Sequence, residues 1–184
     1  QEMARAVEQA IHDKRHLVVE AGTGVGKSFG YLVPAILAAT EGESAEDGSQ
    51  KSAKRIIIST HTISLQEQLL GKDIPLLNSV IPREFTTVLV KGRRNYVSLR
   101  RLQAARNRAP SLFHEPAEFD QLEQLHRWSQ QTQDGSRADL DYTPQMIVWD
   151  EVASDSGNCM GRNCPTYKDC FYYQSRRRMD HARI

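Results

Sequence analysis

The sequence has few cysteines and no apolar run long enough to cross a membrane. Its 184 residues include three cysteines, an odd number that cannot pair fully as disulfides. No secretory leader precedes the first helical pattern, so we expect a cytoplasmic protein with no membrane partner. Cysteines that cluster in a reducing compartment are more often metal ligands than disulfides.

Acidic residues are missing from one segment. Every charged residue between Lys91 and Arg108 is basic, although the net charge of the whole chain is only +1. The stretch from Glu115 to Asp155 is rich in carboxylates instead. Such asymmetry favours a face that binds a polyanion, but a solvated helix face would have the same composition.

Apolar periodicity predicts helices that alternate with short buried strands. The expected elements are a helix at 2–12, a strand at 16–20, a helix at 26–39, a strand at 55–60, a helix from 64 onward and a strand at 86–90. Pro34 should bend or shorten the second helix, and the polar tract from Glu41 to Lys54 should be an exposed loop. This order predicts an α/β fold with an open parallel sheet.

The most specific motif follows the first expected strand. AGTGVGKS, from Ala21 to Ser28, fits the phosphate-binding loop G-x-x-x-x-G-K-[ST] with alanine in place of the first glycine. In such a loop, backbone N–H groups bind phosphate oxygens, the lysine reaches the β- and γ-phosphates, and the hydroxyl binds Mg²⁺. We therefore predict catalytic roles for Lys27 and Ser28. The predicted nucleotide-binding residues are Gly22, Thr23, Gly24, Val25, Gly26, Lys27 and Ser28.

Polar side chains mark the next junction of strand and helix. Thr60, Thr62 and Gln66 lie in IIISTHTISLQEQLL, where the second expected strand gives way to a helix. Hydroxyl and amide groups in that position can hold the phosphates of a nucleic acid without contacting its bases. The alternative is that a Ser or Thr hydroxyl simply caps the helix.

Four segments in this order resemble a known helicase family. They are VVEAGTGVGKSFGYLVPAI, STHTISLQEQL, LVKGRRNYVSLRRL and NCMGRNCPTYKDC. Over nearly its whole length the chain is similar to the start of a DinG-type DNA helicase, a bacterial relative of the XPD branch of superfamily 2. The resemblance implies an ATP-dependent enzyme that moves along single-stranded or forked DNA and unwinds duplexes.

The resemblance also implies a domain organisation. In that family a RecA-like first motor lobe is interrupted by a small domain that holds a [4Fe–4S] cluster on four cysteines. We expect an incomplete RecA-like ATP-binding lobe at 1–90, a mainly helical insert with the cysteines at 91–175, and the start of the return to the lobe at 176–184. The parent protein should be monomeric and contain a second RecA-like lobe. The isolated chain should not unwind DNA, because helicase turnover also needs groups that cannot be placed in it.

One family ligand is replaced in this sequence. The first family cysteine stands at the second position after the tyrosine of K-G-R-x-N-Y, where this chain has Ser98; the others match Cys159, Cys164 and Cys170. A serine alkoxide is a harder ligand than a thiolate and a poor substitute unless the site stabilises it. Four outcomes are open: a cube with Ser98 or water as its fourth ligand, a three-iron cluster, zinc completed by a histidine such as His126 or His181, and no metal at all.

The same resemblance implies that the basic segment, residues 91–108, binds DNA. Lys91, Arg93 and Arg94 would neutralise phosphates of a single strand, and Tyr96 would stack on a base. The predicted DNA-binding residues are thus Thr60, Thr62, Gln66, Lys91, Arg93, Arg94 and Tyr96. Alternatively, 98–108 forms a helix with its leucines inward and its basic side chains in water.

The stretch MIVWDE leaves a different enzyme open. Asp150 and Glu151 follow a short apolar run, the form of the strand whose carboxylates hold Mg²⁺ in P-loop ATPases. With that strand the chain would be a compact nucleotide kinase or transferase. The run begins just after Pro144, however, and in the resembled family it lies inside the cluster domain. A third possibility is a nucleic-acid-binding redox module without motor function, whose strand binding would be indifferent to ATP.

Overall fold

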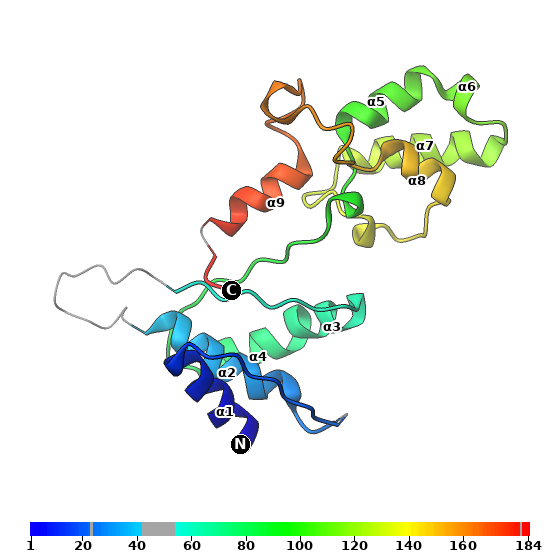
Figure 1. Ribbon diagram of the computed structural model, residues 1–184. Coiled ribbons are helices and arrows are strands. Elements are labelled where there is room, and N and C mark those ends of the chain that lie inside the picture. The colour runs from blue at the N-terminus through cyan, green and yellow to red at the C-terminus, as the bar shows by residue number, and fades with distance from the viewer. Residues whose placement is uncertain (23, 42–53, 181) are drawn as a thin grey trace. The chain divides into compact units, whose positions relative to one another are not determined.

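The computed structural model describes residues 1–22, 24–41, 54–180 and 182–184, and they form two compact units (Figure 1). One unit takes in the described residues of 1–89 and 181–184, and the other is Val90–Asp180. Most of the loop predicted between Glu41 and Lys54 lies outside the described residues. Each unit has a hydrophobic core of its own.

Helices of the first unit follow the predicted apolar pattern. They are α1 (Glu2–Asp13), α2 (Lys27–Thr40), α3 (Ile63–Gln68), the π-helix η1 (Leu69–Asp73) and α4 (Ile74–Val80). The predictions of helices at 2–12, 26–39 and from 64 onward are confirmed, and α1 packs against α2. Pro34 does not shorten α2, because Leu32 and Ile36 on either side of it are both fully buried and this packing offsets the lost backbone hydrogen bond.

None of the residues described is assigned to a β-strand, so the parallel sheet stays a prediction. The expectation of a buried strand at 16–20 is wrong for this structure, since Val18 is 97% exposed. Within the described residues, no backbone hydrogen bond reaches 16–20. A strand is buried by its neighbours in a sheet, and this segment has none there.

The chain end nevertheless pairs with one expected strand. Ile184 N–H donates to Thr86 O at 3.1 Å, and Val88 N–H donates to Ile184 O at 2.9 Å. These two bonds around Thr87 have the arrangement of a parallel pair. On the other side, Ile56 N–H donates to Arg183 O at 2.8 Å. The last residues therefore bridge the segments predicted as the second and third strands.

The second unit is mainly helical. Its helices are α5 (Leu99–Asn107), α6 (Ala109–Leu112), α7 (Pro116–Ser129), α8 (Met146–Val152) and α9 (Phe171–Met179), with 3₁₀ turns η2 (Arg93–Asn95), η3 (Arg137–Asp139) and η4 (Gly161–Asn163). Helices α5, α7 and α8 pack on one another (Figure 1). Leu102 faces this core with 2% exposure, and Leu99 packs against it, as expected for a helix at 98–108.

The stretch MIVWDE is helical and not a strand. It forms most of α8, in which Val148, Trp149 and Val152 point into the core of the second unit. The spacing of these three residues matches the inner face of a helix. Asp150 and Glu151 therefore do not end a sheet strand beside a phosphate loop, which contradicts the kinase alternative.

The helices of the described residues are short or carry polar faces. None of them is both long enough and apolar enough to span a membrane.

Candidate nucleotide loop and cysteine pocket

The glycine-rich loop enters α2 through a left-handed backbone. Gly24 has φ of 80° and Gly26, the N-cap of α2, has φ of 78°. A Cβ atom added to either glycine would meet nothing within 4 Å. Glycine is therefore required by the backbone conformation and not by crowding, and the loop leads into the N-terminus of a 14-residue helix.

The two side chains predicted to act on phosphate and Mg²⁺ begin that helix. Lys27 Nζ donates to the carbonyl of Ala21 at 2.9 Å, across the loop. Ser28 is half-buried, and Val25 is 66% exposed at the loop surface. Thr23, also predicted to bind nucleotide, lies outside the described residues. The helix dipole and the lysine together favour an anion at this loop.

Of the hydroxyls predicted to bind a DNA strand, that of Thr62 has a hydrogen-bond partner within the fold. Its Oγ1 accepts a hydrogen bond from Leu65 N–H at 3.3 Å and so caps α3, as the alternative interpretation anticipated. Thr60 Oγ1 is buried and has no hydrogen-bond partner within the described part of the chain. Gln66 is half-buried on α3.

In the second unit, backbone pairing fixes Ser98 beside the segment that leads to the cysteines. Ser98 N–H donates to Val152 O at 2.8 Å, and Ser154 N–H donates to Tyr96 O at 2.7 Å. An antiparallel bridge joins Val97 to the chain between these bonds. Ser98 is also the N-cap of α5, where its Oγ accepts from Arg101 N–H at 3.4 Å.

The three cysteines lie at the ends of short elements. Cys159 precedes η4, Cys164 follows it as its C-cap, and Cys170 is the N-cap of α9. Cys170 makes no side-chain capping hydrogen bond, and Cys164 Sγ lies 3.3 Å from Thr166 Oγ1. All three are free thiols.

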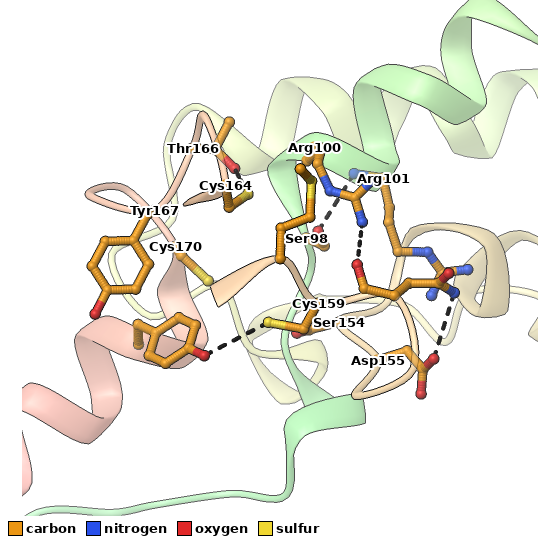
Figure 2. A pocket seen from close by; sticks show the side chains of 13 residues that line it. Ser98, Arg100, Arg101, Ser154, Asp155, Cys159, Cys164, Thr166, Tyr167 and Cys170 are labelled. Atoms are coloured by element: carbon orange, nitrogen blue, oxygen red, sulfur yellow. Dashed lines mark hydrogen bonds between the residues drawn. The ribbon is translucent and has the colours of Figure 1, made fainter. Parts of the chain in front are cut away.

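One pocket brings together the four positions that the resemblance pairs with cluster ligands. Ser98, Cys159, Cys164 and Cys170 all line it (Figure 2). The described residues hold no group of three His, Cys, Asp or Glu side chains arranged around a single metal ion. His126 does not line the pocket, and His181 lies outside the described residues.

Hydrogen-bond donors surround Cys159. Gly161 N–H donates to its Sγ at 3.4 Å, and the Tyr173 hydroxyl lies 3.7 Å from it. Burial raises the pKa of the Cys159 thiol, but the Gly161 amide, the Tyr173 hydroxyl and the Arg93 guanidinium outweigh burial and hold that pKa below its ordinary value of 9.0. The site thus favours a thiolate at this position.

Arg93 is the cation behind this effect. Its guanidinium lies over the Tyr172 ring, 3.8 Å from the centroid, and 5.6 Å from that of Tyr173. Its Nη1 atom is buried and has no hydrogen-bond partner among the residues described. A buried donor without a partner is costly unless an acceptor approaches it, so this corner of the unit suits an anionic group.

Other residues of the basic segment make contacts within the second unit. Lys91 Nζ donates to Ser136 Oγ at 2.6 Å and lies 3.7 Å from Asp134 Oδ2. Tyr96 is completely buried, so the expectation that it stacks on a base is wrong for this structure. The reason is that its ring belongs to the core of the unit, and its oxygen accepts from Lys91 N–H.

Arg94 is the accessible basic residue of the predicted trio. Its side chain is 69% exposed and pairs with Asp150 at 2.8 Å. An exposed pair of this kind is worth little and opens readily. Arg94 can therefore reach a phosphate without disturbing the core.

Sequence reasoning missed several residues of the pocket. Tyr173 and Gly161 contact Cys159 directly, and Arg100 and Arg101 line the pocket with Ser98. Gly161, with φ of 55°, follows Cys159 by two residues, and such spacing is a usable signal for an N–H to sulfur contact. The contacts of the Tyr173 and Arg101 side chains at the pocket depend on pairing between segments that are distant in the sequence. Local spacing does not predict such pairing.

Comparison with known proteins places the chain in a family. The DEAD/DEAH box helicase family matches residues 2–164. The chain is 36% identical over 179 residues to the ATP-dependent DNA helicase YoaA of Escherichia coli, covering 96% of this chain and 26% of that protein. It is 34% identical over 192 residues to the ATP-dependent DNA helicase DinG of Photobacterium profundum, covering 100% of this chain and 26% of that protein.

A third relative has a similar degree of identity. The ATP-dependent helicase DinG of Mycobacterium tuberculosis is 35% identical over 192 residues, covering 96% of this chain and 27% of that protein. The chain thus spans about a quarter of the length of these relatives. The loop from Ala21 to Ser28, the cysteine segment and these matches agree: the chain belongs to the DEAD/DEAH box helicase family, among its DinG-type members.

Proposed function

We propose that the protein is an ATP-dependent DNA helicase and that this chain supplies the nucleotide loop of its first motor lobe. The observation that carries the proposal is a loop with two left-handed glycines that leads directly into Lys27 and Ser28, in a chain of the DEAD/DEAH box helicase family. The names of its relatives, ATP-dependent DNA helicases, support the same activity.

The chemistry assigned to the loop is phosphoryl binding. Its backbone N–H groups and Lys27 hold the β- and γ-phosphates of ATP, and Lys27 exchanges the Ala21 carbonyl for a phosphate oxygen. Ser28 provides an oxygen ligand for Mg²⁺, which neutralises charge on the phosphates when bound. The water-orienting base and the arginines of a second RecA-like lobe belong to the rest of the protein in this proposal.

The sheet of the lobe is part of the proposal. We infer that the segments around Ile56 and Thr87 are strands of a RecA-like parallel sheet, with the chain end between them. The parallel pattern of hydrogen bonds that Ile184 makes with Thr86 and Val88 supports this inference. The cysteine unit, Val90–Asp180, is then an insert between two strands of that lobe.

A lysine substitution tests the nucleotide site. Lys27→Ala removes a charged donor to the phosphates, so the affinity for a fluorescent ATP analogue with Mg²⁺ should fall by about tenfold or more, and the full-length protein should no longer unwind a forked duplex. Lys54→Ala is the matched control, because Lys54 pairs with Glu41 on the exposed surface. Nucleotide affinity that survives Lys27→Ala would contradict the assignment.

The kinase alternative has a test of its own. It requires Asp150 to act as the Mg²⁺ carboxylate, although Asp150 lies on α8 in the unit that does not contain the loop. Asp150→Asn should leave nucleotide hydrolysis unchanged in the full-length protein, since the Asp150 side chain pairs with the exposed Arg94. Loss of hydrolysis in this variant would revive the alternative.

We also propose that the cysteine pocket holds an iron–sulfur cluster. Three thiols and Ser98 line one pocket without converging on one ion, which suits a cluster whose ligands bind different iron atoms better than a single zinc ion. Ser98 and Cys170 are the N-caps of α5 and α9, so the positive ends of two helix dipoles lie at positions that line the pocket, which suits an anionic group there. Arg93 supplies a buried donor to the same anionic group.

Ser98 is the candidate fourth ligand of such a cluster. Its Oγ already accepts a hydrogen bond from Arg101 N–H, and donors of that kind stabilise an alkoxide. Ser98→Cys should raise iron and sulfide per chain in anaerobically purified protein, because a thiolate is the softer ligand. Cys170→Ala should lower both. Absence of iron from wild type and from Ser98→Cys alike would remove the cluster from the proposal.

Single-stranded DNA is the proposed partner, and each unit contains candidate contact residues of its own. Gln66 lies on the helix that Thr62 caps, and Arg94 is an exposed cation. The Thr60 hydroxyl is buried and lacks a hydrogen-bond partner among the described residues, so it would have to become exposed before it could hold a phosphate. Groups of this kind bind phosphates without reading sequence. Arg94→Gln should weaken strand binding evenly across sequences and reduce its salt dependence. Lys91 and Arg93 act instead within the fold of the insert.

A further inference from the structure

Two hydroxyl groups lie beside sulfur atoms in the cysteine pocket. Thr166 and Tyr173 line this pocket together with Cys159 and Cys164. The nucleotide loop and the proposed strand contacts use neither residue. Because a hydroxyl can donate a hydrogen bond to a neighbouring sulfur, these two side chains bear on how the pocket stabilises negative charge.

A tight turn places Thr166 beside Cys164. Tyr167 N–H donates to Cys164 O at 3.0 Å, which closes a turn with Pro165 and Thr166 in its middle. Proline is favoured at the second position of such a turn, because its ring fixes φ near the value that the turn needs. Thr166 Oγ1 lies 3.3 Å from Cys164 Sγ, and both residues are half-buried (Figure 2).

The first turn of α9 places Tyr173 beside Cys159. The Tyr173 ring packs against two other tyrosines, with centroid distances of 4.8 Å to Tyr167 and 5.3 Å to Tyr172. Packing of this kind fixes the direction of an aromatic ring, and here the Tyr173 hydroxyl lies 3.7 Å from Cys159 Sγ. Gly161 N–H donates to the same sulfur at 3.4 Å. The Cys159 sulfur therefore has two neighbouring donors.

Metal binding would fix the direction of both hydroxyl contacts. A free thiol and a hydroxyl can each donate to the other, but a thiol that binds a metal has lost its proton and can only accept. With a cluster on these cysteines, the Tyr173 hydroxyl donates to Cys159 Sγ, and the Thr166 hydroxyl donates to Cys164 Sγ.

We propose that Tyr173 and Thr166 are positioning residues that set the reduction potential of the cluster through hydrogen bonds to its ligand sulfurs. The inference rests on the proposed function, which places an iron–sulfur cluster on these cysteines. Neither residue is itself a ligand. Hydrogen bonds from surrounding residues to the sulfurs are among the features that set such potentials.

The direction of the effect follows from the charge. A one-electron reductant such as dithionite is oxidised and adds one electron to the cluster, and the bonds to the cysteines are kept. Part of the added negative charge lies on the ligand sulfurs, so a donor to a sulfur stabilises the reduced form more than the oxidised form. Removal of either hydroxyl should therefore lower the reduction potential.

The test is a reductive titration of the full-length protein, purified without oxygen and followed by visible absorption and electron paramagnetic resonance. Tyr173→Phe and Thr166→Val each remove one hydroxyl at nearly constant size, whereas Thr166→Ser keeps it. Tyr167→Phe is the matched control, because the Tyr167 hydroxyl points away from the cysteines (Figure 2). Each substitution is made in the wild type and again in Ser98→Cys.

Tyr173→Phe and Thr166→Val should each lower the equilibrium constant for one-electron reduction by about threefold or more. At about 59 mV for a tenfold change, threefold is a shift of about 28 mV to more negative potential. Thr166→Ser and Tyr167→Phe should keep the potential of their parent. A purely structural role would lower the iron per chain but leave the potential of the retained cluster unchanged, and that result would overturn the proposal. If Tyr173→Phe retains no iron, Thr166→Val and Thr166→Ser decide alone.

Failure of the proposed function would look different. Absence of iron from the wild type and from Ser98→Cys alike would refute the cluster, and this inference with it. A cluster whose potential is unchanged in Tyr173→Phe and Thr166→Val would refute the inference alone.

Discussion

At the scale of single residues, Gly135 is the position least tolerant of a side chain. It is buried, has φ of 63°, and a Cβ atom there would overlap the Phe171 ring. Its carbonyl accepts from Val97 N–H at 3.0 Å, so the backbone cannot move away without breaking the pairing next to Ser98. Gly135→Ala should lower the free energy of unfolding of this unit by about 2–4 kcal/mol, measured by urea denaturation.

Gly161 provides the control for that substitution. It has φ of 55°, but the nearest atom to an added Cβ is the Tyr173 hydroxyl at 3.9 Å. Gly161→Ala should therefore cost only the left-handed backbone, about 1–2 kcal/mol. Equal losses in the two variants would show that the Phe171 contact contributes nothing.

Residue types are enough to propose the two sites but not to predict their individual contacts. The glycines and Lys27 were assigned from a motif whose spacing is fixed by the backbone it needs. Tyr96 was misassigned because an aromatic residue in a basic run looks the same whether it faces a strand or a core. Tyr96 lies in the core of the insert, with the Tyr172 ring edge-on to it at 6.1 Å between centroids, and no local pattern links positions so distant in the sequence.

At the scale of elements, helices were predictable and strands were not. Helices α1, α2 and α5 can be predicted because their apolar residues repeat at helical spacing within one segment. A parallel strand needs neighbours from elsewhere in the chain, so the apolar run around Val18 predicts a strand but cannot supply the pairing that would bury it. The π-helix η1 ends just before Pro75, whose ring crowds the preceding turn, so its position has a cause in the local sequence. The burial of Asp73 in η1 depends on packing with α2, which the local sequence does not predict.

The start of α7 makes a pH-dependent contribution to stability. Glu118 Oε2 accepts from the backbone N–H groups of Glu115 and His114, at 3.0 and 2.8 Å. These bonds hold the pKa of Glu118 below its ordinary value of 4.5. A depressed carboxyl pKa stabilises the fold fully above the unfolded value, and the contribution is lost as the pH falls through the lower folded value.

Glu118→Gln should therefore destabilise the second unit most at neutral pH. The difference from wild type should shrink as the pH falls below 4.5, because wild-type Glu118 then becomes neutral as well. Urea denaturation at neutral and acidic pH measures the difference. Asp120→Asn, an exposed position on the same helix, controls for the loss of one negative charge. A difference that does not depend on pH would contradict the role of the ionised carboxylate.

At the scale of the whole molecule, the two units differ in how completely they bury their apolar residues. The insert surrounds its core with helices from one continuous segment, Val90–Asp180. The first unit leaves Val18 97% and Ile57 81% exposed, both in segments predicted as strands. Local helix packing explains the first case, while a sheet of parallel strands depends on pairing between remote segments.

Separate cores predict separate unfolding. Leu122 is 2% exposed in the core of the insert, and Leu32 is fully buried in that of the first unit. Leu122→Ala should leave a cavity that costs about 2–5 kcal/mol and should speed amide hydrogen exchange across Val90–Asp180 while exchange in the first unit is unchanged. Leu32→Ala should have the reverse effect. If either substitution speeds exchange equally in both units, they unfold as one cooperative body, and the stability of the cysteine pocket then depends on the nucleotide lobe.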